Sequence, residues 1–387
     1  MPIAIKEVSL RNILSFGPQG LSIGLGSLNV LIGPNGSGKS NLIEVFALLR
    51  SSPADLRAFI RENGGVDEWI WKGTPKEPAS IDAVFSYLMG PRPLRHVLEF
   101  HSEGERFRLD DERIEELPAH AAVRPYYYYR YMGGRQVLYT AAGERELGGE
   151  AGELDQSVLA QIRDPDSYPM LFYLGSIYEK IRIYREWTFG RNAIFREPQK
   201  ADMRNDRLEE DFSNLGLFLN RLRRIPKAKT AILEGLRDLY EEFCDFDIIV
   251  EGGIVQVFFA EGEFAIPAPR LSDGTLRYLC LLAILCDPAP PPLVCIEEPE
   301  LGLHPDILPK LADRLVDASE RTQLIVTTHS DILVDAMSER PEAVIICEKH
   351  SGQTSMERLN EQKLSAWLQQ YRLGELWTRG ELGGTRW

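Results

Sequence analysis

The spacing of apolar side chains near the start of the chain predicts a strand, a loop and a helix in succession. Residues 3–10 alternate between apolar and polar side chains, which is the two-residue period of a half-buried strand. Residues 28–32 form a second, apolar run that leads directly into a glycine-rich turn. From Lys39 to Leu49 the apolar residues recur with the period of a helix. We therefore expect a buried strand whose end meets the start of a helix through a tight loop.

Short alternating runs between about residues 80 and 140 predict an antiparallel sheet beside the first strand. A glycine-containing turn, Met132-Gly133-Gly134, separates the last two runs and predicts a hairpin. The five runs are Ile81–Tyr87, Arg95–Phe100, Arg106–Leu109, Val123–Tyr131 and Gln136–Thr140.

The second half of the chain changes from helical periodicity to alternating helices and strands. Helical spacing dominates from about Pro169 to Phe243, broken by a polar stretch at 196–206. A predicted hairpin, Asp247–Val250 and Ile254–Ala260, turns at residues 251–253. The elements predicted after it alternate as in a parallel α/β sheet: helix Gly274–Cys286, strand Leu293–Ile296, helix Pro305–Ala318, strand Gln323–Val326, helix Ser330–Met337 and strand Ala343–Cys347.

Length, composition and charge exclude several classes of protein. A chain of 387 residues predicts one large domain with an insert or two modest domains, and 44% apolar residues argue against wholesale disorder. The net charge of −14 argues against coating nucleic acid by bulk electrostatics. The longest apolar run, Leu279–Cys286, is far too short to span a bilayer, and the first ten residues hold no signal-peptide core. Five cysteines without CxxC spacing fit small buried side chains in a cytoplasmic protein better than disulfides or a zinc site.

A phosphate-binding loop is the strongest chemical signal in the sequence. Residues 33–40 read GPNGSGKS, which fits G-x-x-x-x-G-K-[ST] between an apolar strand and a helix. The glycines allow backbone N–H groups to surround phosphates, and the helix N-terminus adds partial positive charge. Lys39 would reach the β- and γ-phosphates, and Ser40 would bind Mg²⁺. A glycine-rich turn without a ligand is the alternative.

Two adjacent carboxylates at the end of a buried strand form the second candidate feature. Residues 293–296 are apolar, and Glu297 and Glu298 follow them. Successive strand residues face opposite sides, so the two carboxylates must have different roles. We expect Glu297 to hold Mg²⁺ through water and Glu298 to orient the attacking water or accept its proton. Taken alone, an acidic strand end could equally be unremarkable.

Two further segments could contact phosphate. In Leu271-Ser272-Asp273-Gly274-Thr275, Ser272 can cap the apolar helix that follows, and the start of a helix is an anion site. A simple helix cap is the alternative. His329 ends the apolar strand that follows the acidic one, which makes it a candidate γ-phosphate contact rather than an ordinary surface histidine.

The order of these four motifs resembles the ATP-binding-cassette (ABC) ATPases, with residues 300–305 as the D-loop region. The opening LRNILSF (residues 10–16) and the string EEPELGLHP (297–305) are similar to the RecF/SMC/OLD branch. Residues 206–221 and the ending GGTRW (383–387) resemble small stand-alone bacterial members found near phage-defence genes and mobile elements.

The resemblance implies an α/β fold: an ABC-type P-loop NTPase head with a mixed central sheet and no long coiled coil. The head would cover residues 1–350, with an antiparallel β region at about 80–140 and a helical insert at about 165–245, followed by a strand and helix tail at 351–387. It implies catalytic roles for Glu298 and His329. The implied nucleotide contacts are Asn12, Asn35, Gly36, Ser37, Gly38, Lys39, Ser40, Ser272 and Gly274, and the implied metal site is Ser40, Glu297 and Gln199.

The sequence departs from the family pattern at two positions. Glu297 stands where aspartate is more usual, which a water-mediated metal contact tolerates. Asp273 replaces the second glycine of the ABC signature, which the resemblance assigns to residues 271–275, so its carboxylate must turn away from a bound phosphate or repel it. The sequence pattern does not identify the Q-loop glutamine. We assign it to Gln199, at the entry to the helical region, with Gln136 as the alternative.

The resemblance also implies a function that one chain cannot complete. Two heads would sandwich two ATP molecules, with the signature of each head acting on the nucleotide of the other. We expect a Mg²⁺-dependent dimeric ATPase that acts as a sensor or motor for a separately encoded effector, such as a nuclease or toxin, in phage defence or DNA maintenance. The alternatives are a RecF-like, ATP-gated DNA clamp in which slow hydrolysis resets binding and, behind it, a transporter subunit.

Three weaker patterns concern partners. Residues 180–207 hold eight basic and four acidic residues, and residues 221–229 hold five basic and no acidic residues, so either could contact DNA or form a solvated helix face. The tyrosine-rich run 124–131 could stack bases, although packing within a sheet is the simpler interpretation. The aromatic tail at 367–377 is expected to pack on the head, with partner docking as the alternative.

Overall fold

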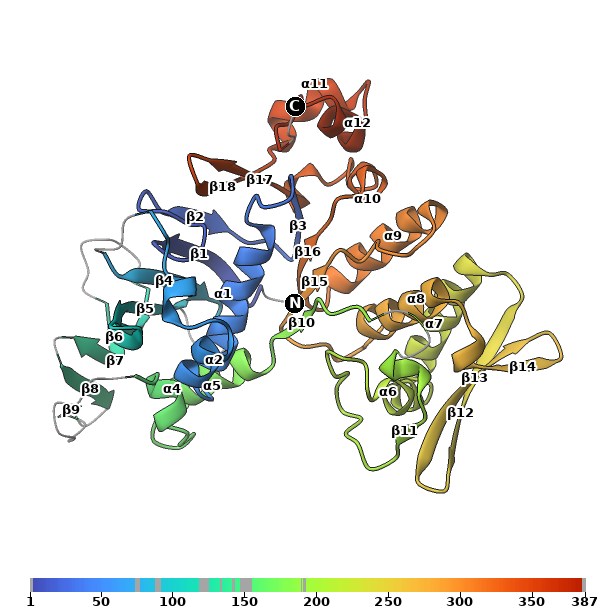
Figure 1. Cartoon of the computed structure of the whole chain (residues 1–387), viewed down its shortest axis with the longest axis horizontal. Coiled ribbons are helices and arrows are strands. Elements are labelled where there is room, and N and C mark those ends of the chain that lie inside the picture. The colour runs from blue at the N-terminus through green and yellow to red at the C-terminus, as the bar shows by residue number, and fades with distance from the viewer. Residues whose placement is uncertain are drawn as a thin grey trace. The chain divides into compact units, whose positions relative to one another are not determined.

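The chain divides into two units, each built from separate stretches of sequence. In this computed structural model the described residues are 3–73, 77–87, 92–117, 125–132, 134–140, 143–146, 155–188, 190 and 193–384 (Figure 1). Unit 1 comprises Met1–Ile181, Glu342–Asn360 and Leu382–Trp387. Unit 2 comprises Arg182–Pro341 and Glu361–Glu381.

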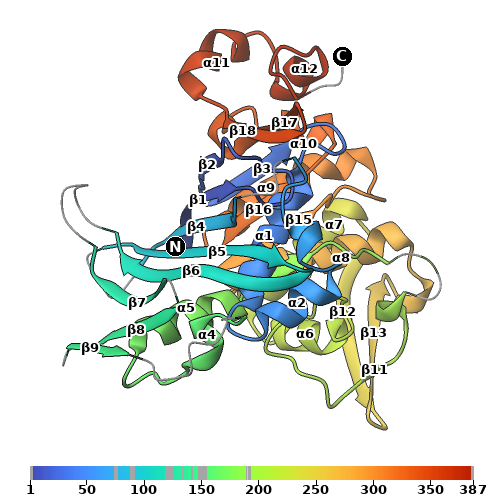
Figure 2. The same ribbon diagram turned by 60° about the vertical axis from the view of Figure 1, so that its left-hand side comes forward.

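Unit 1 contains a large antiparallel sheet. Its described strands pair in the order β2-β1-β4-β5-β6-β7-β8-β9, and Figure 2 shows β4, β5 and β6 lying side by side. Short connections join β1 to β2 and each strand from β4 to β9 to the next, which favours antiparallel pairing, whereas β1 and β4 pair although they are far apart in sequence. The bounds are β1 Ile5–Arg11, β2 Leu21–Gly24, β4 Ala79–Phe85, β5 Leu94–Glu103, β6 Arg106–Glu116, β7 Tyr127–Met132, β8 Arg135–Thr140 and β9 Gly143–Glu146.

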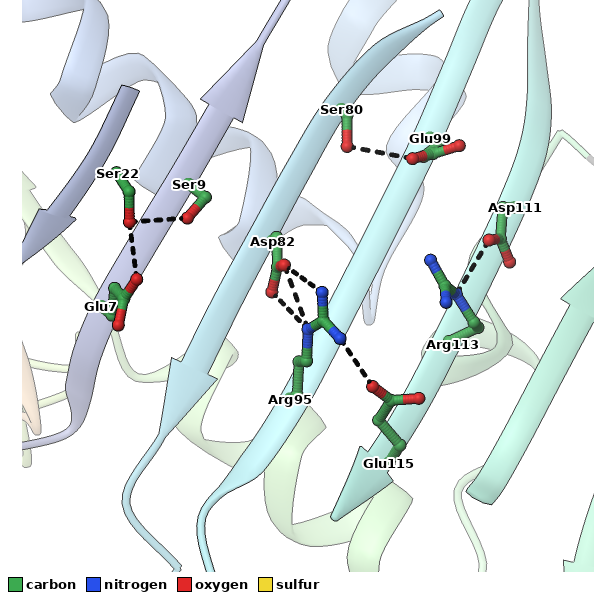
Figure 3. A network of polar contacts seen from close by, with 10 residues as sticks. All are labelled: Glu7, Ser9, Ser22, Ser80, Asp82, Arg95, Glu99, Asp111, Arg113 and Glu115. Atoms are coloured by element: carbon green, nitrogen blue, oxygen red, sulfur yellow. Dashed lines mark hydrogen bonds and ion pairs between the residues drawn. The ribbon is translucent and has the colours of Figure 1, made fainter. Parts of the chain in front are cut away.

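The two faces of this sheet differ in polarity. Along β4 the residues alternate strictly between buried and half-buried, as the pleat of a one-sided sheet requires. Figure 3 shows the polar face, where Arg95 on β5 pairs with Asp82 on β4 at 2.5 Å and with Glu115 on β6 at 3.0 Å. Further along the face, Arg113 pairs with Asp111 at 2.8 Å. The two ion pairs of Arg95 cross between strands and hold the register of β4, β5 and β6, whereas the pair of Arg113 and Asp111 lies within β6.

A buried polar cluster joins the other face of the sheet to the helices of unit 1. The His96 ring lies 2.8 Å from the Tyr178 hydroxyl and 3.3 Å from the Glu112 carboxylate. That carboxylate also accepts hydrogen bonds from the Ser157 hydroxyl at 2.5 Å and the Val158 amide at 2.9 Å. Because buried polar groups are costly unless they are paired, this network fixes how the helices that carry Val158 and Tyr178 pack on β5 and β6.

The rest of unit 1 carries the strand that precedes the glycine-rich loop. Strand β3 (Leu28–Ile32) is buried along its whole length and pairs in parallel with β17, which pairs antiparallel with β18. The other elements of unit 1 are α1 Lys39–Ser51, α2 Leu56–Glu62, α3 Val66–Trp69, α4 Val158–Gln161, α5 Pro169–Glu179, β17 Val344–His350 and β18 Gln353–Arg358.

Unit 2 contains a parallel arrangement and a small antiparallel sheet. Strands β10, β15 and β16 pair in parallel, with Cys295 of β15 opposite Ile183 on one side and Ile325 on the other. Strand β13 pairs antiparallel with β12, β11 and β14. The strand bounds are β10 Arg182–Tyr184, β11 Gln199–Lys200, β12 Phe243–Glu251, β13 Ile254–Glu261, β14 Phe264–Pro267, β15 Leu293–Glu297 and β16 Gln323–Thr327.

Helices α6, α7 and α9 of unit 2 pack against α8, whose residues from Leu276 to Leu285 are all buried. Gly235 of α7 allows this close approach, since a Cβ there would lie 2.4 Å from a Leu282 methyl group. Figure 1 shows α6, α7 and α8 grouped beside β12 and β13. The helices are α6 Leu215–Leu222, α7 Pro226–Leu239, α8 Asp273–Leu285, α9 Leu308–Ser319, α10 Asp331–Asp335, α11 Glu361–Leu368 and α12 Leu373–Thr378, with 3₁₀ turns η1 Ile194–Arg196, η2 Ala268–Arg270, η3 Pro305–Ile307 and η4 Pro341–Ala343.

The two C-terminal helices, α11 and α12, differ in how much of their surface is buried. Helix α12 buries Leu373, Leu376 and Trp377, and the Asp335 carboxylate of α10 accepts hydrogen bonds from its first amides, including Gly374 N at 2.6 Å. Helix α11 buries no residue, and Trp367 is 46% exposed. The expected docking of the aromatic tail is therefore confirmed for α12 and is wrong for Trp367.

Each predicted element corresponds to an observed one, but the structure also contains elements that were not predicted, among them α2, α3 and β2. The region predicted to be helical between 169 and 243 also contains β10 and β11, of three and two residues. Such strands are too short to show a period and exist only because β15 and β13 pair with them. The predicted helix 305–318 begins as η3 and continues as α9. Among the described helices the longest, α7, has 14 residues, which leaves no long coiled coil.

Parts of three predicted segments lie outside the described residues. Residue Gly133 of the predicted hairpin turn, residues 123–124 of the preceding run, and Thr385–Trp387 of the predicted ending lie outside them. Within the described part of the chain, none of the helices combines the length and the apolar character needed to cross a bilayer.

Candidate functional site

The glycine-rich loop of unit 1 connects β3 to α1. Gly33, Gly36 and Gly38 all have positive φ angles, of 146°, 79° and 104°. A Cβ atom at Gly33 would lie 2.1 Å from the Cys347 carbonyl oxygen, and one at Gly38 would lie 2.2 Å from the Thr354 hydroxyl. Both close contacts come from β17 and β18, so these strands require glycine at the two positions. The loop is thus held in one conformation by its neighbours.

Three residues outside the sequence motif, Thr354, Ser15 and Asn41, form the hydrogen-bond network beside this loop. The Thr354 hydroxyl on β18 is hydrogen-bonded to the Ser37 carbonyl at 2.9 Å and to the Ser15 hydroxyl at 2.7 Å. Asn41 on α1 donates to the same Ser15 oxygen at 2.6 Å. Thr354 is 317 residues away from Ser37 in sequence, so no local signal could reveal this contact. Ser15 lies in the LRNILSF segment, and the family resemblance of that segment was the one sequence signal that pointed to this residue.

The chemistry of the loop fits a phosphate group. Lys39 is buried, and its ammonium group donates to the carbonyls of Gly33 at 2.7 Å and Pro34 at 3.1 Å, so its charge is held against the loop. The Ser37 hydroxyl is buried and has no hydrogen-bond partner among the described residues. Helix α1 has Gly38 as its N-cap residue, so it lacks a side-chain cap, and its first turn contains no acidic residue. An anion here would meet a helix N-terminus and a lysine.

The remaining predicted nucleotide contacts of unit 1 occupy different environments. Asn35, Gly36 and Ser40 are exposed, and Ser40 lies in the first turn of α1. Asn12 is buried, and its amide nitrogen donates to the Glu77 carboxylate at 3.3 Å. Its side-chain oxygen has no hydrogen-bond partner in the described structure. Among the described contacts, Asn12 is therefore not part of the network around the loop.

In unit 2, the acidic strand end is the carboxyl end of β15. Glu297 is the last residue of the strand, and its carbonyl accepts a hydrogen bond from the Trp187 indole at 2.9 Å. The Glu298 amide donates to the Thr327 carbonyl at 3.0 Å. Glu298 has φ of +46°, a left-handed conformation that is rare outside glycine and costs about 1–2 kcal/mol. Such strain occurs where the surroundings impose it, and functional sites are enriched in it.

A buried arginine supports this strained turn. Arg277 on α8 is 1% exposed and donates a 2.5 Å hydrogen bond to the Glu298 carbonyl. Its guanidinium also lies over the Trp187 ring, 4.2 Å from the ring centroid, as a cation–π pair. Burial lowers the pKa of Arg277 to about 10, which leaves it charged at neutral pH. Arg277 and Trp187 therefore hold the backbone of Glu297 and Glu298 from two sides, and sequence reasoning assigned neither of them a role.

The two predicted catalytic residues lie together. The His329 ring nitrogen Nε2 is 3.5 Å from the Glu298 carboxylate, and both side chains are about one-third exposed. The Glu300 carboxylate accepts hydrogen bonds from the Thr328 hydroxyl and the His329 amide, each at 2.7 Å. Glu300 thus joins the segment after β15 to the turn after β16. The arrangement places a carboxylate and an imidazole side by side at one edge of the parallel strands.

The signature segment begins α8, as predicted. The Ser272 hydroxyl accepts a hydrogen bond from the Thr275 amide at 3.0 Å, which caps the helix. A Cβ at Gly274 would lie 2.9 Å from the Gly302 carbonyl, so a side chain there would force this turn to shift. The Asp273 carboxylate is engaged by Arg196 at 2.5 Å and by the Gly190 amide at 3.2 Å. The hydrogen bond from Arg196 lowers the pKa of Asp273.

The structure places both candidate Q-loop glutamines in sheets. Gln199 is buried in β11, and its side-chain oxygen accepts a hydrogen bond from the Gly216 amide at 2.7 Å. This bond occupies the oxygen that a metal would need and gives Gln199 a structural role at the start of α6, which counts against the metal assignment. Gln136 lies on β8, where its side-chain oxygen accepts a 3.3 Å hydrogen bond from the Tyr129 hydroxyl.

Several basic residues of the two segments form ion pairs with carboxylates of unit 2. Arg221 pairs with Asp287 at 2.9 Å, and Lys229 pairs with Asp245 at 2.8 Å. Arg223 pairs with Asp247. In the other segment, ion pairs join Arg204 to Asp206 at 2.7 Å and Arg207 to Glu209 at 3.7 Å. These pairs reduce the positive charge that either segment could offer to DNA.

The tyrosine-rich run follows the sheet interpretation. Tyr129 and Tyr131 of β7 are buried, whereas Tyr126 before the strand is exposed. Tyr128 donates a hydrogen bond to Glu116 at 2.6 Å. Arg124 lies outside the described residues. Packing within the sheet is therefore confirmed for the two buried rings.

The cysteines of the described chain fall into two groups. Cys280, Cys286, Cys295 and Cys347 are buried, as expected for small apolar side chains, and Cys244 is exposed.

Comparisons with known proteins agree with this geometry. The family described as "AAA domain, putative AbiEii toxin, Type IV TA system" matches residues 28–335. No curated protein matches the chain.

Three solved structures of SMC head domains are similar to the whole chain. A head bound to the C-terminal winged-helix domain of ScpA shares 16% identity over 94% of this chain and 99% of its own, with a TM-score of 0.56. A Pyrococcus furiosus head bound to the C-terminal domain of ScpA shares 14% identity over 95% of this chain and 98% of its own, with a TM-score of 0.52. A Pyrococcus yayanosii head shares 11% identity over 95% of this chain and 99% of its own, with a TM-score of 0.50. The chain therefore belongs to the AAA-domain family that matches residues 28–335, and its fold is that of an ABC-type P-loop ATPase head.

Proposed function

We propose that this chain is a Mg²⁺-dependent ATPase that works as a dimer and controls a separately encoded effector, such as a nuclease or toxin, in phage defence or DNA maintenance. The observation that carries the ATPase part is the pair formed by Glu298 and His329 at the end of the parallel strands, 3.5 Å apart. A carboxylate held in a strained turn beside an imidazole is suited to orienting water and accepting its proton.

The residues divide the work of binding and hydrolysis. Lys39 and the amides that begin α1 bind the β- and γ-phosphates, for which the loop has the right charge and conformation. Glu298 orients the attacking water and receives its proton. His329 contacts the γ-phosphate. Arg277 and Glu300 fix the two turns that present these side chains.

Mg²⁺ would be held by Ser40 and, through water, by Glu297. Both are oxygen donors of the kind that Mg²⁺ prefers, and Ser40 is exposed at the start of α1. When bound, the ion neutralises negative charge on the β- and γ-phosphates.

The dimer is proposed because the signature cannot act on the nucleotide of its own head in this family. Ser272 and the first turn of α8 would contact the γ-phosphate held by the phosphate loop of a second copy. Hydrolysis would then separate the heads and pass a signal to the effector.

A protein effector has more support than DNA as the partner. Two of the similar SMC heads were solved with a domain of ScpA, which shows that this fold can bind a protein. The description of the matching family names a putative toxin of a Type IV toxin–antitoxin system. The net charge of −14 and the ion-paired basic segments weaken the alternative of an ATP-gated DNA clamp.

Glu298→Gln tests the proposal, because it removes the proton acceptor and keeps the shape of the side chain. We expect ATP turnover to fall by roughly 100-fold or more, with ATP-dependent dimers retained. Asp313→Asn, an exposed carboxylate on α9 of the same unit, is the matched control and should keep the wild-type rate. A wild-type rate in Glu298→Gln would refute the assignment, and an ATP-loaded variant that stays monomeric would refute the dimer.

A further inference from the structure

The charge at the start of α8 presents a problem for phosphate binding. Asp273 lies in the first turn of the helix, directly after the Ser272 cap. The proposed function brings the γ-phosphate of a second copy to this turn. A helix N-terminus attracts anions, but a carboxylate already there repels a phosphate and competes for the same amides.

Arg196 is placed to cancel that charge. It ends the η1 turn, and its side chain is only 10% exposed. One nitrogen of its guanidinium donates to the Leu271 carbonyl at 2.8 Å and to the Pro269 carbonyl at 2.9 Å. Another nitrogen donates to the Asp273 carboxylate at 2.5 Å. The Gly190 amide donates to the same carboxylate oxygen at 3.2 Å.

We propose that Arg196 is a positioning residue of the signature: it neutralises Asp273 and turns it toward η1, so that the start of α8 can accept the γ-phosphate of a second copy. This inference rests on the proposed function, since it needs the ATP-bound dimer. The hydrogen bond that lowers the pKa of Asp273 supports it, because the carboxylate is then charged and its charge is balanced.

A consequence is that dimer closure depends on a contact between two segments that are far apart in sequence. Arg196 and Asp273 are separated by 77 positions, and only the η1 turn brings them together. Any change that withdraws η1 exposes an unbalanced carboxylate where phosphate must bind. The signature of this chain is therefore active only while η1 stays in place.

Two roles of Arg196 must be separated, and a second substitution separates them. Arg196→Met removes the charge and also the two bonds to the carbonyls of Pro269 and Leu271. Adding Asp273→Asn to this variant removes the carboxylate charge that Arg196 balances, but it does not restore the hydrogen bonds to the carbonyls of Pro269 and Leu271. If charge is what matters, Asp273→Asn rescues Arg196→Met, whereas a merely structural role of Arg196 gives no rescue.

The experiment measures ATP-dependent dimerisation in a Glu298→Gln background by analytical ultracentrifugation with Mg²⁺. We expect Arg196→Met to raise the dimer dissociation constant at least 10-fold, and addition of Asp273→Asn to bring it back within about 3-fold of the parent. Arg204→Met is the matched control, because it breaks a surface ion pair with Asp206 in the same region, and it should stay within 2-fold. An unchanged constant in Arg196→Met, or no rescue by Asp273→Asn, overturns the inference.

A titration with a fluorescent ATP analogue distinguishes this failure from failure of the proposed function. The phosphate loop lies in unit 1, so Arg196→Met monomers should bind the analogue with wild-type affinity. If the Glu298→Gln parent binds the analogue yet never dimerises, the proposed dimer fails and the inference fails with it. If the parent dimerises and Arg196→Met dimerises equally well, only the role of Arg196 is refuted.

Discussion

The turn that carries Glu298 depends on Arg277, and replacing this arginine tests how the site is held together. Arg277 donates a 2.5 Å hydrogen bond to the Glu298 carbonyl from a buried position on α8. Arg277→Met keeps an unbranched side chain against Trp187 and removes the charged donor. The variant should fold, because methionine fills the same space without burying a charge.

The size of the effect follows from two opposing terms. A hydrogen bond from a charged donor contributes about 1.5–3 kcal/mol. The left-handed backbone of Glu298 costs about 1–2 kcal/mol, which the intact turn must offset. Without the bond, the strained conformation is no longer favoured and the carboxylate leaves its place beside His329. A loss of 1.5–3 kcal/mol from the transition state lowers kcat by roughly 10- to 150-fold.

Steady-state phosphate release measures this change, and it should appear in kcat with little change in KM. Arg314→Met is the matched control: Arg314 lies on α9 of the same unit and pairs with Asp238 at 3.5 Å, away from Glu298. Thermal unfolding of both variants checks that they are folded. A folded Arg277→Met protein with kcat within 2-fold of the wild type would show that the arginine does not hold the catalytic turn.

Three further changes test other parts of the molecule. Lys39→Ala removes the charge held against the loop and should abolish binding of a fluorescent ATP analogue; wild-type affinity would contradict the loop assignment. Glu300→Ala frees the turn before His329 and should lower kcat about 10-fold, whereas Glu300→Gln keeps an oxygen acceptor and should retain most activity; equal rates in the two variants would argue against this role. Burial raises the pKa of Asp111 to about 6 from its usual 3.8, so the folded chain holds this proton more tightly than the unfolded chain, and stability is lost as pH rises through about 4 to 6. Asp111→Asn removes that loss and should stabilise the protein by up to about 3 kcal/mol at pH 8 and by little at pH 4 in thermal or denaturant unfolding; the same gain at both pH values would contradict the assignment.

The parts of the fold that were predicted correctly are those with a strong local pattern. Strand β3 and helix α1 were recognised because an apolar run, a glycine-rich loop and a helical period follow one another directly. The hairpin of β12 and β13 was recognised from alternation around two glycines. Strand β10 was missed because three residues cannot establish a period, and it exists only through its pairing with β15.

The candidate site shows the same division. The phosphate loop, the carboxylates at the end of β15 and the cap of α8 come from contiguous residues, so their spacing alone predicted them. The Q-loop glutamine has no such local pattern, and Gln199 instead bonds to the Gly216 amide. The sequence alone left the basic residues of 221–229 available for DNA, but β12 supplies Asp245 and Asp247 as partners of Lys229 and Arg223.

The sequence by itself determined which groups are the candidates for the proposed chemistry, because a phosphate-binding loop and an acidic strand end need only a few residues in fixed local order. Tertiary structure decided what holds those groups in position. Thr354 fastens the loop from a strand more than 300 positions away, Arg277 supports Glu298 from another helix, and Arg196 balances Asp273 across 77 positions. These contacts depend on how the chain packs, and packing brings together residues whose separation in sequence carries no signal.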